Sequence, residues 1–363
     1  MRAMVPLLFS PFSHRIPGSL SRTAPRFFAS GKRLPELGAA ESMPQTSTRS
    51  FYSRLRRGAW LSPLLVFALC LWSCQRPGTG DSQGSSDTEE RTIDPGNPGR
   101  IISLSPNVTD ILEGVGAFDR VVAVSDYCFY PPGVATLPRV GGWQNASLEE
   151  VASLAPDLVV MAEVQAPFVD DHLQALGIPT LVVPSQSLQD VFTAIDAVGR
   201  GVGRQQQARR LQNEVRAVLD RVAVRTRNLP KPSVLCVVDR VPGTLRGLYA
   251  ATRGSYLSRL IEIAGGKPIA PPATFNYGRI GKEAVVTLDP DVVIDMVQGA
   301  KGPFAEEPVA IWSELKEIQA VRRGRVHPVR EMFVLHASQF VAQTAELFSR
   351  LIHPEVFGKD GVR

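Results

Sequence analysis

Few side chains in this sequence have the spacing that covalent or metal-dependent chemistry requires. The four cysteines form no C-x-x-C pair and the five histidines show no H-E-x-x-H spacing, which argues against the common zinc motifs. No G-x-S-x-G nucleophile motif and no P-loop is present. Residues 199–203 read G-x-G-x-G but follow a helical pattern and lack the final spacing of a dinucleotide site. We therefore expect neither an enzyme nor a resident cofactor or metal.

One cysteine, Cys74, lies in a context that is typical of covalent modification. Three arginines precede an apolar run over residues 59–72, which is the order found in a secretory signal, and the run is too short to span a membrane. The run ends in a sequence that resembles the lipobox of bacterial lipoproteins, although Trp72 is bulkier than the usual residue. We expect residues 1–73 to be a signal region, with a true start near Met43, and Cys74 to be acylated. An ordinary signal peptide or a buried apolar helix is the alternative.

The charge of the chain is concentrated in the signal region. Residues 1–73 hold ten basic and two acidic side chains, whereas the rest of the chain holds 30 basic and 33 acidic ones. A nucleic-acid-binding domain needs a concentrated basic face, so no nucleic-acid partner is expected. Residues 74–99 are rich in Gly, Ser, Pro and acidic residues, and this composition predicts a flexible tether behind the acylated cysteine.

Strands and helices alternate after the tether. Short β-rich runs such as residues 100–105 and 157–161 are mostly apolar, as in parallel strands that are buried on both faces. Helical patterns that end in glycine, such as residues 109–116 and 168–177, lie between these strands. The order predicts a parallel, Rossmann-like α/β lobe over residues 100–187.

A repeat indicates a second lobe of the same kind. In residues 147–160 and 281–294 a glutamate begins a short helix, a leucine packs beneath it, Pro-Asp turns the chain, and an apolar strand follows. The unit recurs after 134 residues. Two half-chains with the same order of elements favour two lobes over one large sheet. The second lobe is expected over residues 231–357, with a short tail at 358–363.

The segment between the lobes, residues 188–230, has apolar side chains at helical spacing. Three glycines at 199, 201 and 203 are consistent with a turn between two helices, and residues 204–227 contain no Gly or Pro. A long helix there would join the lobes as a stiff strut, although an ordinary crossover helix would show the same pattern. Another helix is expected over residues 333–352.

Several ordered motifs carry a resemblance to a known family. They are residues 102–110, 127–132, 138–143, 148–149 and 154–160. Together they resemble the class III periplasmic solute-binding proteins of vitamin B12 and iron-siderophore ABC importers, especially the cobalamin-binding type, over about residues 100–357. The resemblance implies two α/β lobes joined by a rigid helix and a ligand bound between them. It also implies delivery of the ligand to permease subunits in the inner membrane. Together with the acylated Cys74, this predicts a lipid-anchored monomer in the periplasm.

The resemblance further implies ligand-binding residues. Cobalamin-binding members have aromatic side chains at positions similar to Tyr130, Trp143, Tyr249 and Tyr277. Glu331 and Phe333 lie where the family presents an acidic residue and aromatics, while Met332 departs from the aromatic residue expected. A flat macrocycle requires wide apolar platforms with a few polar contacts, which Tyr and Trp supply.

Two other ligand classes stay open. An anionic ferric siderophore would favour cleft arginines, for which the candidates are Arg139, Arg246, Arg253 and Arg279. Haem would favour an axial Tyr or His, such as Tyr130 or His336. A periplasmic enzyme is a further alternative. Cys128 is expected in a loop and Cys236 in a core strand, in different lobes, so no disulfide is expected between them.

The repeat places Glu149 and Glu283 at equivalent positions in the two lobes. In the resembling family, glutamates at these sites meet arginines of the permease, which implies that this pair sets the docking register. The alternative is that each glutamate only stabilises the positive end of a helix.

Overall fold

The computed structural model describes residues 96–270, 277–296 and 307–358. The signal region, the proposed start at Met43, Cys74, most of the tether and the end of the C-terminal tail lie outside the described residues. Residues 271–276 and 297–306 of the expected second lobe also lie outside them.

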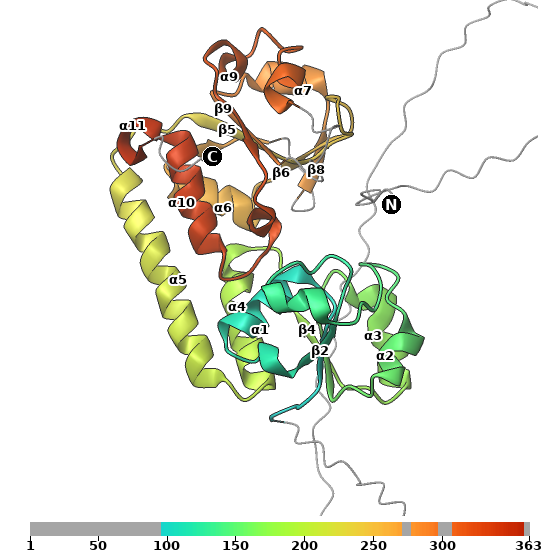
Figure 1. Ribbon diagram of the computed structural model, residues 1–363. Coiled ribbons are helices and arrows are strands. Elements are labelled where there is room, and N and C mark those ends of the chain that lie inside the picture. Colours follow the sequence, from blue (N-terminus) through green and yellow to red (C-terminus); the bar gives the residue numbers. More distant parts are fainter. Residues whose placement is uncertain (1–95, 271–276, 297–306, 359–363) are drawn as a thin grey trace, which may run out of the picture. The chain divides into compact units, whose positions relative to one another are not determined.

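The N-terminal lobe is built on a four-stranded parallel sheet in the order β2-β1-β3-β4. Successive residues of β1 point to opposite faces: Ile101 joins the core cluster beneath α1 and α4, whereas Ile102 joins the cluster beneath α2 and α3. Figure 1 shows these helix pairs on the two sides of the sheet. The apolar strands are therefore buried on both faces, as expected for a parallel sheet. The elements are β1 (Ile101–Ser103), α1 (Pro106–Gly114), η1 (Phe118–Arg120), β2 (Val121–Val124), η2 (Pro132–Thr136), α2 (Leu148–Ser153), β3 (Leu158–Ala162), α3 (Ala166–Ala175) and β4 (Thr180–Val183).

The C-terminal lobe contains a six-stranded sheet in which β10, β9, β5, β6 and β8 follow one another and β7 pairs with β5. The strands are β5 (Ser233–Asp239), β6 (Leu248–Ala251), β7 (Lys267–Pro268), β8 (Tyr277–Ile280), β9 (Val292–Met296) and β10 (Val326–Val329). The sheet is mixed, because β6 runs antiparallel to both β5 and β8. This corrects the expectation of a purely parallel second lobe. The connection from β5 to β6 has no crossover helix, and such a short connection joins antiparallel strands.

Helices cover both faces of this second sheet. One face packs on α6 and α10, and the other packs on α7, α8 and α9, where Trp312 is fully buried. The helices are α6 (Tyr256–Ile263), α7 (Lys282–Leu288), α8 (Pro308–Trp312), α9 (Gln319–Arg322), η3 (Met332–Leu335), α10 (Val341–Ile352) and α11 (Pro354–Phe357).

The helix expected over residues 333–352 is interrupted, and that expectation was wrong. The chain forms the short helix η3, leaves helical geometry over residues 336–340, and enters α10 at Val341. The Ser338 hydroxyl accepts a hydrogen bond from the backbone N–H of Phe340 at 3.3 Å. Such local side-chain bonds compete with helix formation and mark the approach to a new helix.

Two helices, α4 (Leu188–Gly201) and α5 (Gln205–Thr226), connect the lobes. Figure 1 shows α5 extending from the N-terminal lobe along the side of α10 in the C-terminal lobe. With 22 residues, α5 is about 33 Å long. Residues from α1, α4, α5, α6 and α10 belong to one continuous core cluster. The hydrophobic core therefore runs from one lobe to the other through the helical layer.

Candidate functional site

The loop after β2 presents two exposed aromatic side chains on a well-anchored backbone. Phe129 is 57% and Tyr130 is 40% exposed. Beneath them the Arg139 guanidinium donates hydrogen bonds to the carbonyl oxygens of Ser125 and Cys128, both at 2.7 Å. The loop follows the carboxyl end of a parallel strand, which is where open α/β sheets bind ligands. Arg139 therefore holds the loop, and its Nη1 donors are used by backbone carbonyls.

Tyr130 belongs to an aromatic cluster that crosses from one lobe to the other. Its ring meets Phe340 edge to face, with centroids 5.1 Å apart, and Phe340 lies 5.7 Å from Phe333. Such geometries are favourable for aromatic pairs. We call Tyr130, Phe333 and Phe340 the interlobe aromatic cluster. Sequence reasoning missed Phe340 because it placed this residue inside a helix. Ser338, two residues earlier, could have indicated a break in that helix, because serine side chains often form turns before a helix.

Trp143 belongs to a second aromatic pair, within the N-terminal lobe. Its ring lies 5.7 Å from that of Phe168, which is 43% exposed and was also missed from the sequence. Gly141, at φ +98°, allows the tight turn before Trp143. The buried Gln165 amide donates to the carbonyl oxygens of Leu104 at 2.7 Å and of Trp143 at 3.4 Å. This loop, like that of Tyr130, is held by side chains beneath it.

Tyr249 and Tyr277 lie on neighbouring strands of the second sheet. Tyr277 faces Ala251 across the antiparallel pair β6 and β8, so Tyr249, two residues away, is on the same face. Burial raises the pKa of Tyr277 to about 12, and its hydroxyl shares a hydrogen bond with that of Tyr256. The Tyr256 hydroxyl donates to the carbonyl oxygen of Val334 at 3.1 Å. Tyr277 is thus connected through Tyr256 to the segment that carries Phe333.

The remaining predicted ligand contact, Glu331, is exposed at the start of η3. Its carboxylate accepts a hydrogen bond from the backbone N–H of Arg330 at 3.0 Å. Met332 beside it is 43% exposed and Phe333 is half-buried. Glu331 and Met332 are therefore exposed next to Phe333, which belongs to the interlobe aromatic cluster.

His336 lies in the loop before α10 rather than in a helix. Its Nδ1 is 2.8 Å from a carboxylate oxygen of Asp110 in α1, across the two lobes. Of the arginines considered for anionic ligands, Arg246, Arg253 and Arg279 have exposed side chains. Arg253 lines a cavity of about 860 Å³ beside the connecting helices.

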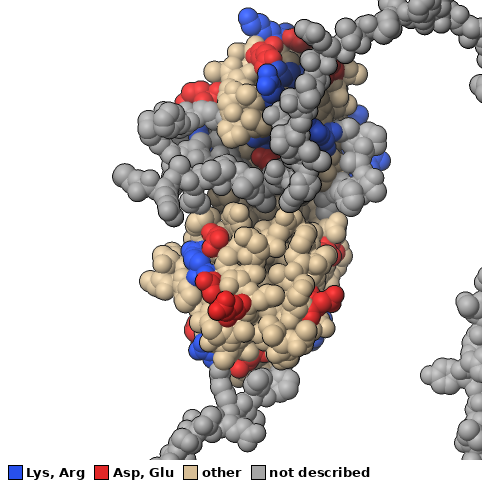
Figure 2. Space-filling view, turned by 90° about the vertical axis from the view of Figure 1, so that its right-hand side faces the viewer, with Lys and Arg blue, Asp and Glu red and all other residues tan. Residues whose placement is uncertain are grey.

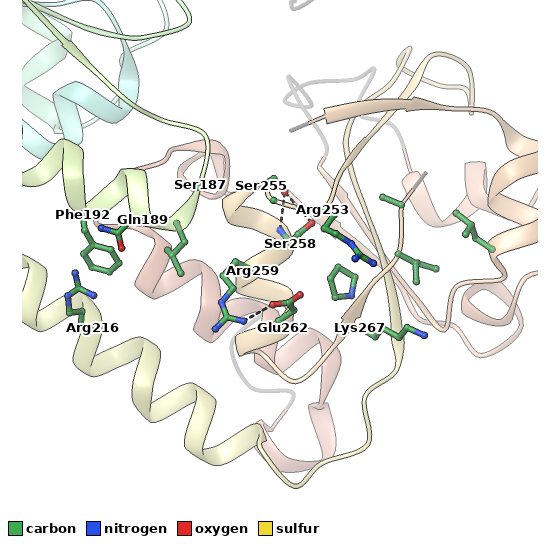
Figure 3. A pocket seen from close by; sticks show the side chains of 16 residues that line it. Ser187, Gln189, Phe192, Arg216, Arg253, Ser255, Ser258, Arg259, Glu262 and Lys267 are labelled. Carbon is green, nitrogen blue, oxygen red and sulfur yellow. Dashed lines mark hydrogen bonds and ion pairs between the residues drawn. The ribbon is translucent and has the colours of Figure 1, made fainter. Parts of the chain in front are cut away.

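That cavity shares no residue with the interlobe aromatic cluster. Figure 3 shows side chains from α4, α5, α6 and β7 around it. Three of its charged groups have partners: the Arg216 guanidinium lies 3.8 Å from the Phe192 ring centre, and Arg259 pairs with Glu262 at 2.6 Å. We attribute the cavity to the packing of the connecting helices.

Glu149 and Glu283 occupy the first turns of α2 and α7 and are exposed. After each helix the chain adopts the same left-handed turn, at Ala155 with φ 43° and at Asp289 with φ 39°. The repeated unit is thus repeated in backbone conformation as well as in sequence. Figure 2 shows acidic side chains on both lobes, several of them beside basic ones.

Both cysteines in the described part of the chain are buried free thiols. Within the described ranges, no three potential metal-ligating side chains of His, Cys, Asp or Glu come together. Nor does any described helix combine the length and the apolar character that a membrane-spanning helix needs.

Comparison with known proteins agrees with this architecture. A periplasmic binding protein family model matches residues 101–330. A Bacillus subtilis (strain 168) protein named as an uncharacterized ABC transporter substrate-binding lipoprotein is 28% identical over 321 residues, covering 83% of this chain and 98% of its own. The vitamin B12-binding protein of Yersinia pestis (strain Pestoides F) is 28% identical over 199 residues, covering 54% of this chain and 68% of its own.

A solved structure shows the same fold. The periplasmic heme binding protein from Pseudomonas aeruginosa superimposes with a TM-score of 0.63 at 22% identity, covering 71% of this chain and 94% of its own. Since the family match extends over more than half of its length, the chain belongs to the periplasmic binding protein family and is a solute-binding protein of the ABC importer type.

Proposed function

We propose that this protein captures cobalamin or a related corrinoid between its two lobes and delivers it to an ABC importer. The observation that carries the proposal is the interlobe aromatic cluster, which brings Tyr130 of one lobe against Phe340 of the other. A large, flat ligand that enters between lobes needs apolar platforms on both of them. The vitamin B12-binding relative supports the same ligand class.

Ferric siderophores and haem are the alternatives. Arg139 donates from Nη1 to the backbone carbonyls of Ser125 and Cys128 below the Tyr130 loop, which leaves it less able to contact an anionic siderophore. Haem is favoured by the presence of both Tyr130 and His336 beside Asp110. Burial, together with Glu113 and Asp110, raises the pKa of Tyr130, which makes loss of the phenol proton to iron less favourable.

Titration of the purified protein with cyanocobalamin, haemin and ferrichrome tests the ligand class. Calorimetry and absorbance should show saturable one-to-one binding of cyanocobalamin without conversion to a product. Tight binding of only haemin or only ferrichrome would replace corrinoid by that class. Turnover of any of the three compounds would favour an enzyme.

We further propose that Cys74 carries a lipid that tethers the folded lobes to a membrane surface in the periplasm. The B. subtilis relative, whose name includes lipoprotein, supports this. Mass spectrometry of the N-terminal peptide from membrane fractions should find diacylated Cys74, and the Cys74→Ser variant should leave the membrane fraction. An unmodified N-terminus downstream of Cys74 would rule out the lipid.

The delivery step is proposed to use Glu149 and Glu283 as the two contacts with permease subunits, and the solute-binding protein is expected to act as a monomer. Exposed side chains at equivalent positions of the two lobes support this assignment. Charges at the rim of an interface mainly control orientation and association rate.

A further inference from the structure

The loop between η3 and α10 is tied to the opposite lobe by three of its side chains. His336 Nδ1 and the Ser338 hydroxyl both contact one carboxylate oxygen of Asp110, at 2.8 and 3.0 Å. The Gln339 amide donates to the backbone carbonyl oxygen of Asp110 at 2.6 Å. The three loop residues lie 226 to 229 positions after Asp110 in the sequence. A single residue of α1 in the N-terminal lobe therefore contacts three side chains of a loop in the C-terminal lobe. We call these four residues the Asp110 latch.

Burial of the Asp110 carboxylate carries a desolvation penalty. The Asp110 side chain is only 1% exposed. A carboxylate removed from water requires hydrogen-bond donors or a positive partner. The loop supplies them to one oxygen of Asp110, while the other oxygen, Oδ1, is buried without a hydrogen-bond partner among the described residues. Loss of the loop contact would leave this carboxylate without its partners. The penalty for leaving the buried charge without hydrogen bonds therefore favours the state in which residues 336–339 contact Asp110.

The packing of α1 is adapted to this contact. A Cβ atom at Gly114, one turn beyond Asp110, would lie 3.0 Å from the Gln339 amide nitrogen and 2.7 Å from a methyl carbon of Leu211. A side chain at this position would require the ends of the Leu211 and Gln339 side chains to shift. The same surface of α1 thus accommodates both the loop and the connecting helix.

The latched segment also carries the aromatic residues of the candidate site. Phe333 and Phe340 stand at its two ends, and Phe340 packs on Tyr130. Within the C-terminal lobe the segment is fastened by the Tyr256 hydroxyl, which bonds to the carbonyl oxygen of Val334. The segment is therefore fixed to α6 of its own lobe and to α1 of the other lobe.

We infer that Asp110 is a positioning residue for ligand capture: by latching residues 336–339 to α1, it holds the interlobe aromatic cluster together and fixes the spacing of the lobes. This inference rests on the proposed function. The helices α4 and α5 join the lobes covalently, and the Asp110 latch adds a second, breakable connection. The latched arrangement is the one that is competent to bind ligand.

The kinetics distinguish a positioning role from direct contact with the ligand. When only a fraction of molecules is competent, the apparent affinity falls in proportion to that fraction. The loss then appears mainly in the association rate, because molecules that have bound ligand are in the competent state. Removal of a side chain that touches the ligand instead raises the dissociation rate.

The test uses Asp110→Asn in the purified protein, with cyanocobalamin as the probe and with stopped-flow absorbance and hydrogen exchange as readouts. We expect the association rate to fall about tenfold while the dissociation rate changes little. Amide exchange over residues 336–341 should be faster even without ligand. The control Asp220→Asn, an exposed acidic position of α5, should leave both measurements unchanged, and Tyr130→Ala should act mainly on the dissociation rate.

Unchanged exchange at residues 336–341 together with an unchanged association rate would overturn the inference. A higher dissociation rate with normal exchange would also overturn it, because Asp110 would then contact the ligand directly. Should Asp110→Asn fail to fold, Ser338→Ala and Gln339→Ala each remove one bond and should give the same two effects at smaller size. A wild-type protein that binds no corrinoid would refute the proposed function, whereas the exchange measurement would still test the latch.

Discussion

Asp157 and Asp291 perform the same structural task in the two lobes. The Asp157 carboxylate accepts hydrogen bonds from the backbone N–H groups of Gly99 and Arg100, both at 2.8 Å, just before β1. The Asp291 carboxylate accepts from the backbone N–H and the hydroxyl of Ser233, at 2.9 and 2.8 Å, where β5 begins. Each aspartate follows the Pro of the repeated unit and fixes the first strand of its lobe beside the strand that it precedes.

The first prediction concerns Asp291→Asn. Burial alone would raise the pKa of Asp291, but hydrogen bonds from Ser233 and the nearby Arg323 and Arg325 lower it overall. The carboxylate therefore stabilises the fold above its unfolded pKa of about 4, and this contribution is lost as the pH falls through the lower folded-state value. We expect Asp291→Asn to reduce the free energy of unfolding at pH 7 by about 1 to 2 kcal/mol.

Urea unfolding between pH 7 and pH 3 measures this effect. The difference between the wild type and Asp291→Asn should shrink as the pH falls below about 4. Asp220→Asn, at an exposed position of α5, is the control and should change stability little at any pH. A gap that widened in acid would show that the assigned direction of the pKa shift is wrong.

The second prediction tests the ring of Tyr130. Tyr130→Ala removes the edge-to-face contact with Phe340 and the exposed platform, so cyanocobalamin should bind about tenfold more weakly by calorimetry. Tyr130→Phe keeps the ring and should bind almost normally. Leu176→Ala, an exposed apolar position after α3, is the control. Equal losses in Tyr130→Phe and Tyr130→Ala would mean that the hydroxyl matters, and would favour a ligand whose metal it contacts.

The third prediction concerns delivery. Glu149→Lys combined with Glu283→Lys should lower uptake of the ligand by cells strongly while leaving the affinity of the purified protein unchanged, because both side chains are exposed and each stands in the first turn of its helix. Loss of the favourable charge at each helix start costs about 0.3 to 1 kcal/mol, which thermal unfolding would detect.

Controls for the delivery experiment carry the same charge reversal at neighbouring exposed positions. Glu150→Lys lies beside Glu149, and Glu317→Lys lies between α8 and α9. Both should retain uptake. A parallel loss of ligand affinity in the double variant would assign the glutamates to the ligand site instead.

The fourth prediction concerns the two buried thiols. Burial raises the pKa of Cys128, in spite of hydrogen bonds from Ser125 and Thr109, and it raises that of Cys236 further. Since only the thiolate reacts readily, neither group should react with a disulfide reagent in the native protein at pH 8. Both should react once guanidinium unfolds the chain. Rapid reaction of Cys128 in the native state would show that the loop carrying Tyr130 opens.

Much of the fold could be predicted from local patterns. Continuous apolar runs identified β1 and β3, and the unit around Glu149 and Glu283 indicated two lobes, because strand and helix periodicity and Pro-Asp turns are properties of neighbouring residues. The antiparallel β6 was not foreseen, because strand direction depends on how the chain returns to the sheet. The sequence pattern of a buried strand is the same in either direction.

The candidate site was predictable only in part, for the same reason. The glycine- and proline-rich loops around Tyr130 and Trp143 indicated exposed aromatic residues beyond strand ends. The partnership of Tyr130 with Phe340, and of Asp110 with His336, depends on residues more than 200 positions apart that meet only after both lobes have packed on α4 and α5. Local sequence determined which helices and strands this protein forms, whereas tertiary packing decided which residues meet. The reason is that the desolvation penalty of a buried charge such as Asp110, and the hydrogen bonds that offset it, exist only in the folded protein.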